Sequence, residues 1–278
     1  MKTIIVPTDF SPTAINAMNY AADMATEINA SLHLLHIYQV PIAITDAPLV
    51  MVSVDELKEG AEQKLASLKE GLEHITSGKI KIETEARLGD PIDELQVVCE
   101  RENPFAVIMG SLGHSSFERS LFGSTTLSAI RNITSPVIAV PVGKEYGRGI
   151  QKIGLAVDLQ AVTGGTVFGV IGNIITQLGG ELHVINVNYK EQAVQARNDH
   201  EFAILDAELK HLKPNYHFIK HEDIEEGINE FAENNNLDLI ISIPRKHKLL
   251  EGLFKKSSTR QLVFESRVPV MCVHEEGA

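Results

Sequence analysis

The chain has 278 residues, of which 44% are hydrophobic and 22% charged, and its formal net charge is −12. This length suits two α/β domains of average size, and the composition is that of a globular protein able to bury a sizeable core. The acidic balance argues against nucleic acid or an anionic membrane surface as a partner. No apolar run is long enough to span a membrane, and Cys99 and Cys272 form no paired motif, so we expect a reduced, cytoplasmic protein with both cysteines buried.

Short apolar runs alternate with amphipathic segments along the first 142 residues. Strands are expected at residues 3–7, 31–38, 79–87, 105–110 and 137–140. Helices are expected at residues 12–28, 55–75, 91–102 and 125–133, with an apolar loop at 40–54. This alternation predicts a parallel sheet with right-handed helical crossovers.

The second half of the chain repeats the first. Residues 143–149 are expected to form a polar linker, after which the strand segments recur in the same order. The matching segments are 4–9 with 153–158, 32–37 with 182–187, and 136–137 with 269–270. We therefore expect two tandem domains, at residues 1–142 and 150–278.

A glycine-rich loop separates the fourth expected strand from the helix that follows it. Its three glycines, Gly110, Gly113 and Gly123, allow the main chain to approach a ligand where a Cβ would collide. Ser124 then offers a hydroxyl at the start of a helix, whose free N–H groups suit a phosphate. The spacing is neither that of a Walker loop nor Gly-x-Gly-x-x-Gly, and on spacing alone a plain turn explains it equally well.

Taken together with the opening segment 4–12, this loop resembles the universal stress protein family. In that family the first strand ends in Pro-Thr-Asp, as at residues 7–9, and the ATP loop reads Gly, two residues, Gly, nine residues, Gly-Ser/Thr. The resemblance is close for residues 1 to about 142 and weaker for the rest. It implies two tandem Rossmann-like, flavodoxin-like α/β domains, each a five-stranded parallel sheet in the order 3-2-1-4-5 with helices on both faces.

The resemblance also implies an ATP site between strands one and four, where the strand order reverses. Residues 7–9 and Ile37 are expected to hold the adenine, the loop with Gly110 and Gly113 passes the ribose, and residues 123–125 receive the phosphates. The expected nucleotide-binding residues are Pro7, Thr8, Asp9, Phe10, Ile37, Met109, Gly110, Leu112, Gly113, His114, Arg119, Gly123, Ser124 and Thr125.

Two of these positions have a second interpretation. Asp9 is either a nucleotide ligand or a carboxylate that caps the following helix, and we favour the ligand. Between Gly113 and Gly123, only His114 and Arg119 can carry positive charge, and Arg119 either pairs with a phosphate or lies solvated beside Glu118.

Metal is expected only with the nucleotide. A bound triphosphate normally brings Mg²⁺ or Mn²⁺, held mainly by its own oxygens and water. A site built from protein side chains alone is not expected, because the histidines have no metal-ligand spacing and His33 and His36 fall on opposite faces of a strand.

The second copy has lost the glycine loop. Gly110, Gly113 and Gly123 correspond to Ile243, Lys246 and Lys256, or, with the alignment shifted by one residue, to Ser242, Arg245 and Lys255. We therefore expect nucleotide in the first domain only. The basic residues at 245–256 form either a solvated loop or a retained anion site.

The leading hypothesis for function is an ATP-dependent regulatory module, since the sequence shows no Gly-x-Ser-x-Gly elbow and no Ser-His-Asp order. A slow ATPase or nucleotidyl transferase and a nucleotide-free scaffold are the alternatives. Each copy ends in an apolar strand, at 137–140 and 268–273, expected at a sheet edge. We expect these strands to pair antiparallel as an intramolecular pseudo-dimer, the alternative being two independent domains; a homodimer of whole chains is left open.

Overall fold

The computed structural model describes residues 2–40, 53–111, 124–159, 166–188, 198–244 and 258–274. The first domain contains strands β1 (Thr3–Pro7), β2 (Ser31–Tyr38), β3 (Ile82–Leu88), β4 (Ala106–Gly110) and β5 (Val137–Val140), and helices α1 (Pro12–Glu27), α2 (Val54–Ile75), α3 (Pro91–Glu102) and α4 (Ser124–Asn132). The second contains strands β6 (Lys152–Ala156), β7 (Glu181–Asn188), β8 (Asn215–Lys220), β9 (Leu239–Ser242) and β10 (Val270–Cys272), helices α5 (Thr166–Leu178), α6 (Asn198–Leu209), α7 (Ile224–Asn234) and α8 (Ser258–Glu265), and the short 3₁₀ helix η2 (Lys210–Leu212).

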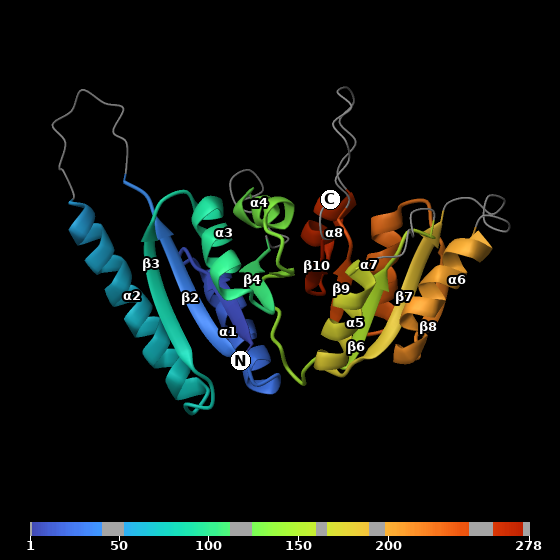
Figure 1. The fold of residues 1–278 in the computed structure, drawn as a ribbon, viewed down its shortest axis with the longest axis horizontal. Helices are drawn as coiled ribbons and strands as arrows, with labels where there is room; N and C mark the ends of the chain where they lie inside the picture. The colour runs from blue at the N-terminus through green and yellow to red at the C-terminus, as the bar shows by residue number, and fades with distance from the viewer. Residues whose placement is uncertain are drawn as a thin grey trace, which may run out of the picture.

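The strands form one ten-stranded sheet in the order β3-β2-β1-β4-β5-β10-β9-β6-β7-β8 (Figure 1). Neighbouring strands within each domain are parallel, and each half has the expected order 3-2-1-4-5. The two halves are therefore two copies of one Rossmann-like unit, as the sequence predicts.

Local signals in the sequence begin the helices of the first domain. The Ser11 hydroxyl accepts a hydrogen bond from the Ala14 N–H, and Pro12 occupies the first helical position of α1. Ser53 and Glu56 form a reciprocal capping box at the start of α2. The Asp90 carboxylate caps α3. These caps hold each crossover helix in place after its strand.

The helices cover both faces of the sheet. One hydrophobic cluster packs α1, α2, α5 and α6 against one face, and a second packs α3, α4, α7 and α8 against the other. Strand residues alternate between the two clusters, as Ile4 and Ile5 do in β1, and both are fully buried. Within the described residues no helix is both long and apolar enough to cross a membrane.

Both cysteines are buried, as expected. Cys99 lies in α3 and Cys272 in β10. Burial raises the pKa of each thiol to about 12, so both stay protonated near neutral pH.

The third strand begins later than the sequence suggests, at Ile82 in place of Lys79. A left-handed turn follows α2, with positive φ at Ser77 (53°) and Gly78 (66°), and the Lys79 N–H donates to the Thr76 carbonyl. Residues 77–79 close this turn. The alternation of polar and apolar residues that starts at Lys79 therefore begins before the strand itself does. The remaining strands of the first domain agree with the sequence to within about one residue.

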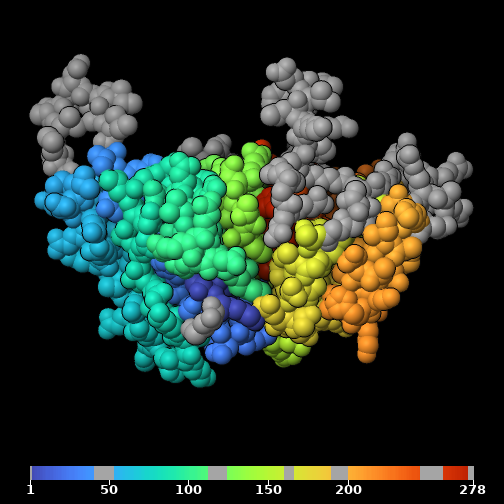
Figure 2. Space-filling view, viewed as in Figure 1, coloured from blue at the N-terminus to red at the C-terminus, as the bar shows by residue number. Residues whose placement is uncertain are grey.

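The last strands of the two domains pair with each other in the centre of the sheet. β10 runs antiparallel to β5, with Met271 opposite Ile138. All residues of both strands are at most 1% exposed, and both hydrophobic clusters continue across the pairing. His274, just beyond β10, also donates a hydrogen bond to the Ile130 carbonyl in α4. Figure 2 shows the surfaces of the two domains in contact along the middle of the molecule.

The segment expected to be a polar linker packs against α1. Tyr146 is only 7% exposed, and its ring meets Tyr20 edge-on at 5.0 Å. The Asn16 side-chain amide donates to the carbonyls of Pro141 and Lys144, at 3.3 Å each. The segment is polar in composition, but its one aromatic residue, Tyr146, is buried against α1. We call this packed connection between the domains, residues 143–149, the strap.

Cleavage of this strap should leave the two halves bound together. The buried antiparallel pairing and the shared clusters hold them independently of the covalent link. A protease site inserted between Gly147 and Arg148, both exposed, allows the test. The cut protein should elute from a sizing column with the uncut protein at micromolar concentration, and elution at half the mass would contradict the pairing.

Replacement of Tyr146 by Ala should lower the free energy of unfolding by about 2–4 kcal/mol, because it removes a buried ring. Tyr146→Phe keeps the ring against Tyr20 and is the matched control, expected to cost much less. Chemical denaturation of both variants measures the difference. Equal stability of Tyr146→Ala and the parent chain would show that the strap is not anchored by this residue.

Candidate functional site

The carboxyl ends of β1 and β4 lie side by side, because Ile5 of β1 pairs with Val107 of β4. β1 pairs with β2 on its other side, so the direction of the chain across the sheet reverses here. Open α/β sheets bind ligands at such a point. Residues 7–9 leave β1 at this edge: Pro7 is half-buried, Thr8 is buried and Asp9 is exposed.

Hydrogen bonds on both sides of Thr8 hold the exit of β1. Its N–H donates to the Leu35 carbonyl at 2.9 Å, and His36 Nδ1 donates to the Thr8 carbonyl at 2.7 Å. The Thr8 hydroxyl accepts from the Phe10 N–H at 3.0 Å, and Phe10 has a left-handed φ of 64°. The backbone around Asp9 is thereby held in one conformation between β1 and α1.

The Asp9 carboxylate supports this turn but does not cap the helix. Its Oδ1 accepts a hydrogen bond from the Ser11 N–H at 2.9 Å, whereas Ser11 itself caps α1. The carboxylate stands at the surface, beside the strand ends.

Gly110 has a packing function that the sequence did not reveal. A Cβ at this position would lie 2.8 Å from the Thr13 carbonyl oxygen and collide with the Thr13 side chain. The glycine therefore allows the first turn of α1 to contact the end of β4. The glycine pattern predicts room for a ligand at Gly110, and in the structure Thr13 occupies that room.

The start of α4 reaches the same point from the other face of the sheet. The Thr126 hydroxyl donates to the Gly110 carbonyl at 2.9 Å, and Ser124 and Thr125 are exposed in the first turn. The N-terminal ends of α1 and α4 thus meet at the end of β4, and both present positive helix dipoles there.

Met109 and Ile37 belong to the hydrophobic cluster on the α3 and α4 face, where Met109 is buried and Ile37 partly buried. Seven expected residues, Pro7, Thr8, Asp9, Phe10, Met109, Gly110 and Ile37, thus lie at the carboxyl ends of neighbouring strands. The expected residues Leu112, Gly113, His114, Arg119 and Gly123 lie outside the described residues.

The second domain repeats the support but not the glycine. The Val157 N–H donates to the Ile185 carbonyl, and the Asn186 amide donates to the Val157 carbonyl at 3.0 Å, as His36 does at Thr8. Asp158 is exposed at the position of Asp9.

Strand pairing decides between the two sequence alignments of the glycine loop. Ile4 pairs with Ala106, and Ile153 pairs with Leu239, so Gly110 corresponds to Ile243. The Ile243 side chain packs against the hydrophobic cluster on the α5 and α6 face. The basic residues at 245–256 lie outside the described residues.

Sequence reasoning missed two groups of residues. His36 supports Thr8, and its match with Asn186 at the same place in the repeat was a usable signal. His33, Glu85 and Glu102 come from three different elements and form a group with metal-ligating atoms. Spacing along the chain cannot reveal such a group, because the sheet brings its members together.

Comparison with known proteins identifies the family. The sequence model of the universal stress protein family matches residues 1–141 and 149–274. A universal stress protein of Methanocaldococcus jannaschii is 30% identical over 146 residues, covering 52% of this chain and 84% of the relative. A second one from the same organism is 28% identical over 155 residues, covering 50% of this chain and 94% of that relative.

A solved structure over the whole length of the chain agrees in fold. A universal stress protein of Archaeoglobus fulgidus aligns over 98% of both chains with a TM-score of 0.73 at 18% identity. Another universal stress protein, solved in complex with cAMP, aligns over 51% of this chain and 98% of its own at 21% identity and a TM-score of 0.39. With both halves matched by the family model, the chain belongs to the universal stress protein family and carries two of its domains in tandem.

Proposed function

We propose that this protein is a regulatory nucleotide-binding module that binds one ATP in its first domain. The observation that carries the proposal is the meeting of two helix N-termini at the end of β4, with Ser124 and Thr125 exposed in the first turn of α4. Backbone N–H groups and hydroxyls in this arrangement suit an anionic phosphate chain.

The purine fits beside the exit of β1. Hydrogen bonds around Thr8 fix the backbone at residues 7–9, and the exposed Asp9 carboxylate accepts hydrogen bonds from a ribose or an amino group. Ile37 and Met109 supply apolar surface on the same face. Mg²⁺ or Mn²⁺ would accompany the phosphates and take most of its ligands from them and from water.

The second domain acts as a structural partner. Ile243 places a branched side chain at the position where Gly110 admits Thr13 in the first domain. The second domain retains the sheet and the paired last strand, which hold the two halves together, and it also keeps the hydrogen bond that supports Val157.

Helix α1 connects the proposed site to the interdomain strap. Its first turn contacts Gly110 through Thr13, and its later residues Asn16 and Tyr20 contact the strap. A nucleotide that shifts α1 would therefore act on the junction of the two domains. It can regulate only if its affinity differs between two positions of that junction.

Replacement of Gly123 by Val should abolish ATP binding and leave the fold intact, because a branched Cβ would block the approach of phosphate to the loop. Isothermal titration of the purified variant measures the loss, and its melting temperature reports the fold. Gly60→Val is the matched control: a Cβ at Gly60 in α2 meets no atom within 4 Å, so binding should be unchanged. ATP affinity equal to that of the parent chain would remove the site from this loop.

ATP should bind with a stoichiometry of one per chain. The second domain has Ile243 in place of Gly110, and Lys246 and Lys256 in place of the other two glycines. The same titration, repeated with cAMP as competitor, measures the number of sites and the preference for a triphosphate. A stoichiometry near two would show that the basic side chains of the second domain bind phosphate in place of backbone N–H groups.

A further inference from the structure

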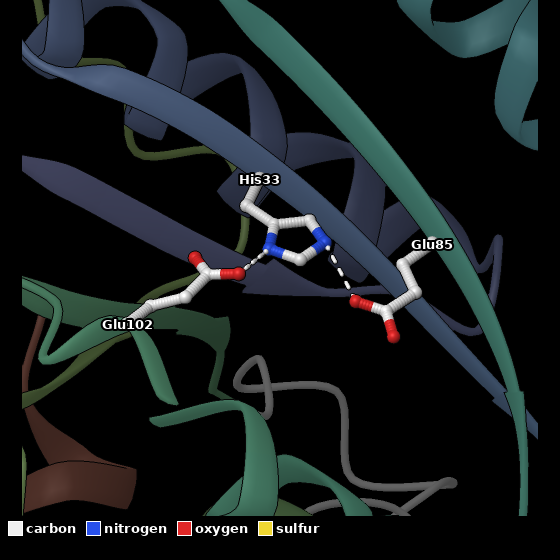
Figure 3. A group of neighbouring side chains, drawn as sticks. All are labelled: His33, Glu85 and Glu102. Atoms are coloured by element: carbon white, nitrogen blue, oxygen red, sulfur yellow. Dashed lines mark hydrogen bonds and ion pairs between the residues drawn. The ribbon is translucent and has the colours of Figure 1, made fainter. Parts of the chain in front are cut away.

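A buried histidine lies between two carboxylates far from the proposed nucleotide site. His33 in β2 is 3% exposed and faces α3. Its Nδ1 is 2.7 Å from Glu102 Oε1 at the end of α3, and its Nε2 is 3.4 Å from Glu85 Oε2 in β3. Figure 3 shows the ring between the two carboxylates, with one ring nitrogen directed at each.

A neutral imidazole cannot satisfy both contacts. It carries one N–H, so one carboxylate accepts a hydrogen bond and the other meets a nitrogen lone pair. Either a second proton on the ring or a metal ion shared by the ring and the carboxylates removes this conflict. One ligand atom from each of His33, Glu85 and Glu102 can be chosen so that all three lie within 4.8 Å of one another. A rearrangement that places both carboxylates beside the same ring nitrogen would bring the three ligand atoms around one ion.

The charged groups around the ring favour a bound cation, because acidic groups outnumber basic ones. Glu85 contacts Arg87 and Arg101, Glu102 contacts Arg101, and Glu94 contacts Arg87. These three carboxylates outnumber the two guanidinium groups by one.

Arg101 fills the bridging position between the two carboxylates. One of its terminal nitrogens is 2.6 Å from Glu85 Oε2 and 2.8 Å from Glu102 Oε1. The side chain is 47% exposed and lies in the last turn of α3, so it can withdraw into water. Ion pairs made by a half-exposed arginine contribute little to stability, less than a metal held by three protein ligands.

An open hollow of about 850 Å³ gives access to the group. His33, Glu85, Arg101 and Glu102 all line it, and so does Lys81. An ion can therefore reach the carboxylates from solvent without unfolding the sheet.

We propose that His33, Glu85 and Glu102 form a binding site for one divalent transition-metal ion, and that Arg101 occupies the bridging position when metal is absent. One imidazole and two carboxylates suit Zn²⁺ or Mn²⁺, with water completing the coordination. The site ties β2 and β3 to the end of α3, and its metal is separate from any ion carried by nucleotide phosphates.

The second domain lacks this ligand set. His183 occupies the position of His33, since His33 pairs with Glu83 and His183 pairs with Asn215. His217 then stands where Glu85 does, and the two histidines lie 3.0 Å apart through Nδ1 and Nε2. His183 is thus the internal control for binding by histidine alone.

Titration of Zn²⁺ into metal-free, nucleotide-free protein tests the proposal. One Zn²⁺ should bind per chain and raise the melting temperature. His33→Gln should weaken binding by at least about tenfold and lose that rise, and Glu102→Gln is a second variant should the first not fold. Glu83→Gln and His183→Gln should bind as the parent chain does.

Arg101→Gln separates a metal site from a network of ion pairs. Its removal frees both carboxylates, so Zn²⁺ affinity should increase. An unchanged or lower affinity in this variant would overturn the competition between arginine and metal. No saturable Zn²⁺ binding, equal affinity in His33→Gln, or loss of binding in His183→Gln would each overturn the site itself.

Discussion

The antiparallel pairing of β5 with β10 is the contact on which the rest of the architecture depends. It joins two five-stranded sheets into one and buries both strands almost completely. Without it, each domain would expose an apolar edge strand, which is prone to pair with other chains. Because the hydrophobic clusters run through it on both faces, the two domains share a core as well as a backbone ladder.

Helix α1 is the second organising element, since its two ends serve different parts of the molecule. Thr13 packs against Gly110 at the strand ends, and Tyr20 packs against Tyr146 in the strap. Burial, together with nearby carboxylates that include Asp238 of the second domain and Glu27, raises the pKa of Tyr20 well above its ordinary value. One helix therefore contacts both the candidate site and the strap, and one of its residues lies close enough to the second domain to be affected by the charge of Asp238.

Most of the fold could be predicted from the sequence, because strand and helix periodicity, Ser11, Asp90 and the internal repeat are local signals. The order of the strands came from the family resemblance, and the sheet confirms it. Contacts between distant segments could not be predicted. The burial of Tyr146 depends on a helix more than a hundred residues earlier, and the reason for Gly110 is Thr13 on another element. The third strand was expected from Lys79, but the turn after α2 extends to Lys79 and β3 begins at Ile82.

In the candidate site too, residues marked by a motif could be predicted, whereas contacts between distant segments could not. The residues that end β1 and β4 were identified from motif and topology, and the structure places them at neighbouring strand ends. The helper His36 was not identified, because its hydrogen bond to the Thr8 carbonyl joins two strands. The group around His33 was missed for the same reason.

Because the two domains belong to one chain, this pseudo-dimer need not keep the same residue at matching positions of its two halves. In a two-fold homodimer every substitution occurs twice, so a change that removes a site removes both copies of it. Here each half can change alone, and the matched positions show this: Gly110 corresponds to Ile243, and Glu85 corresponds to His217. The pairing of β5 with β10 constrains residues of both halves. The residues at the carboxyl ends of the other strands can differ between the halves without disturbing that pairing. A chain of this kind can keep one half as a receptor and convert the other to a new use without losing either its fold or its assembly.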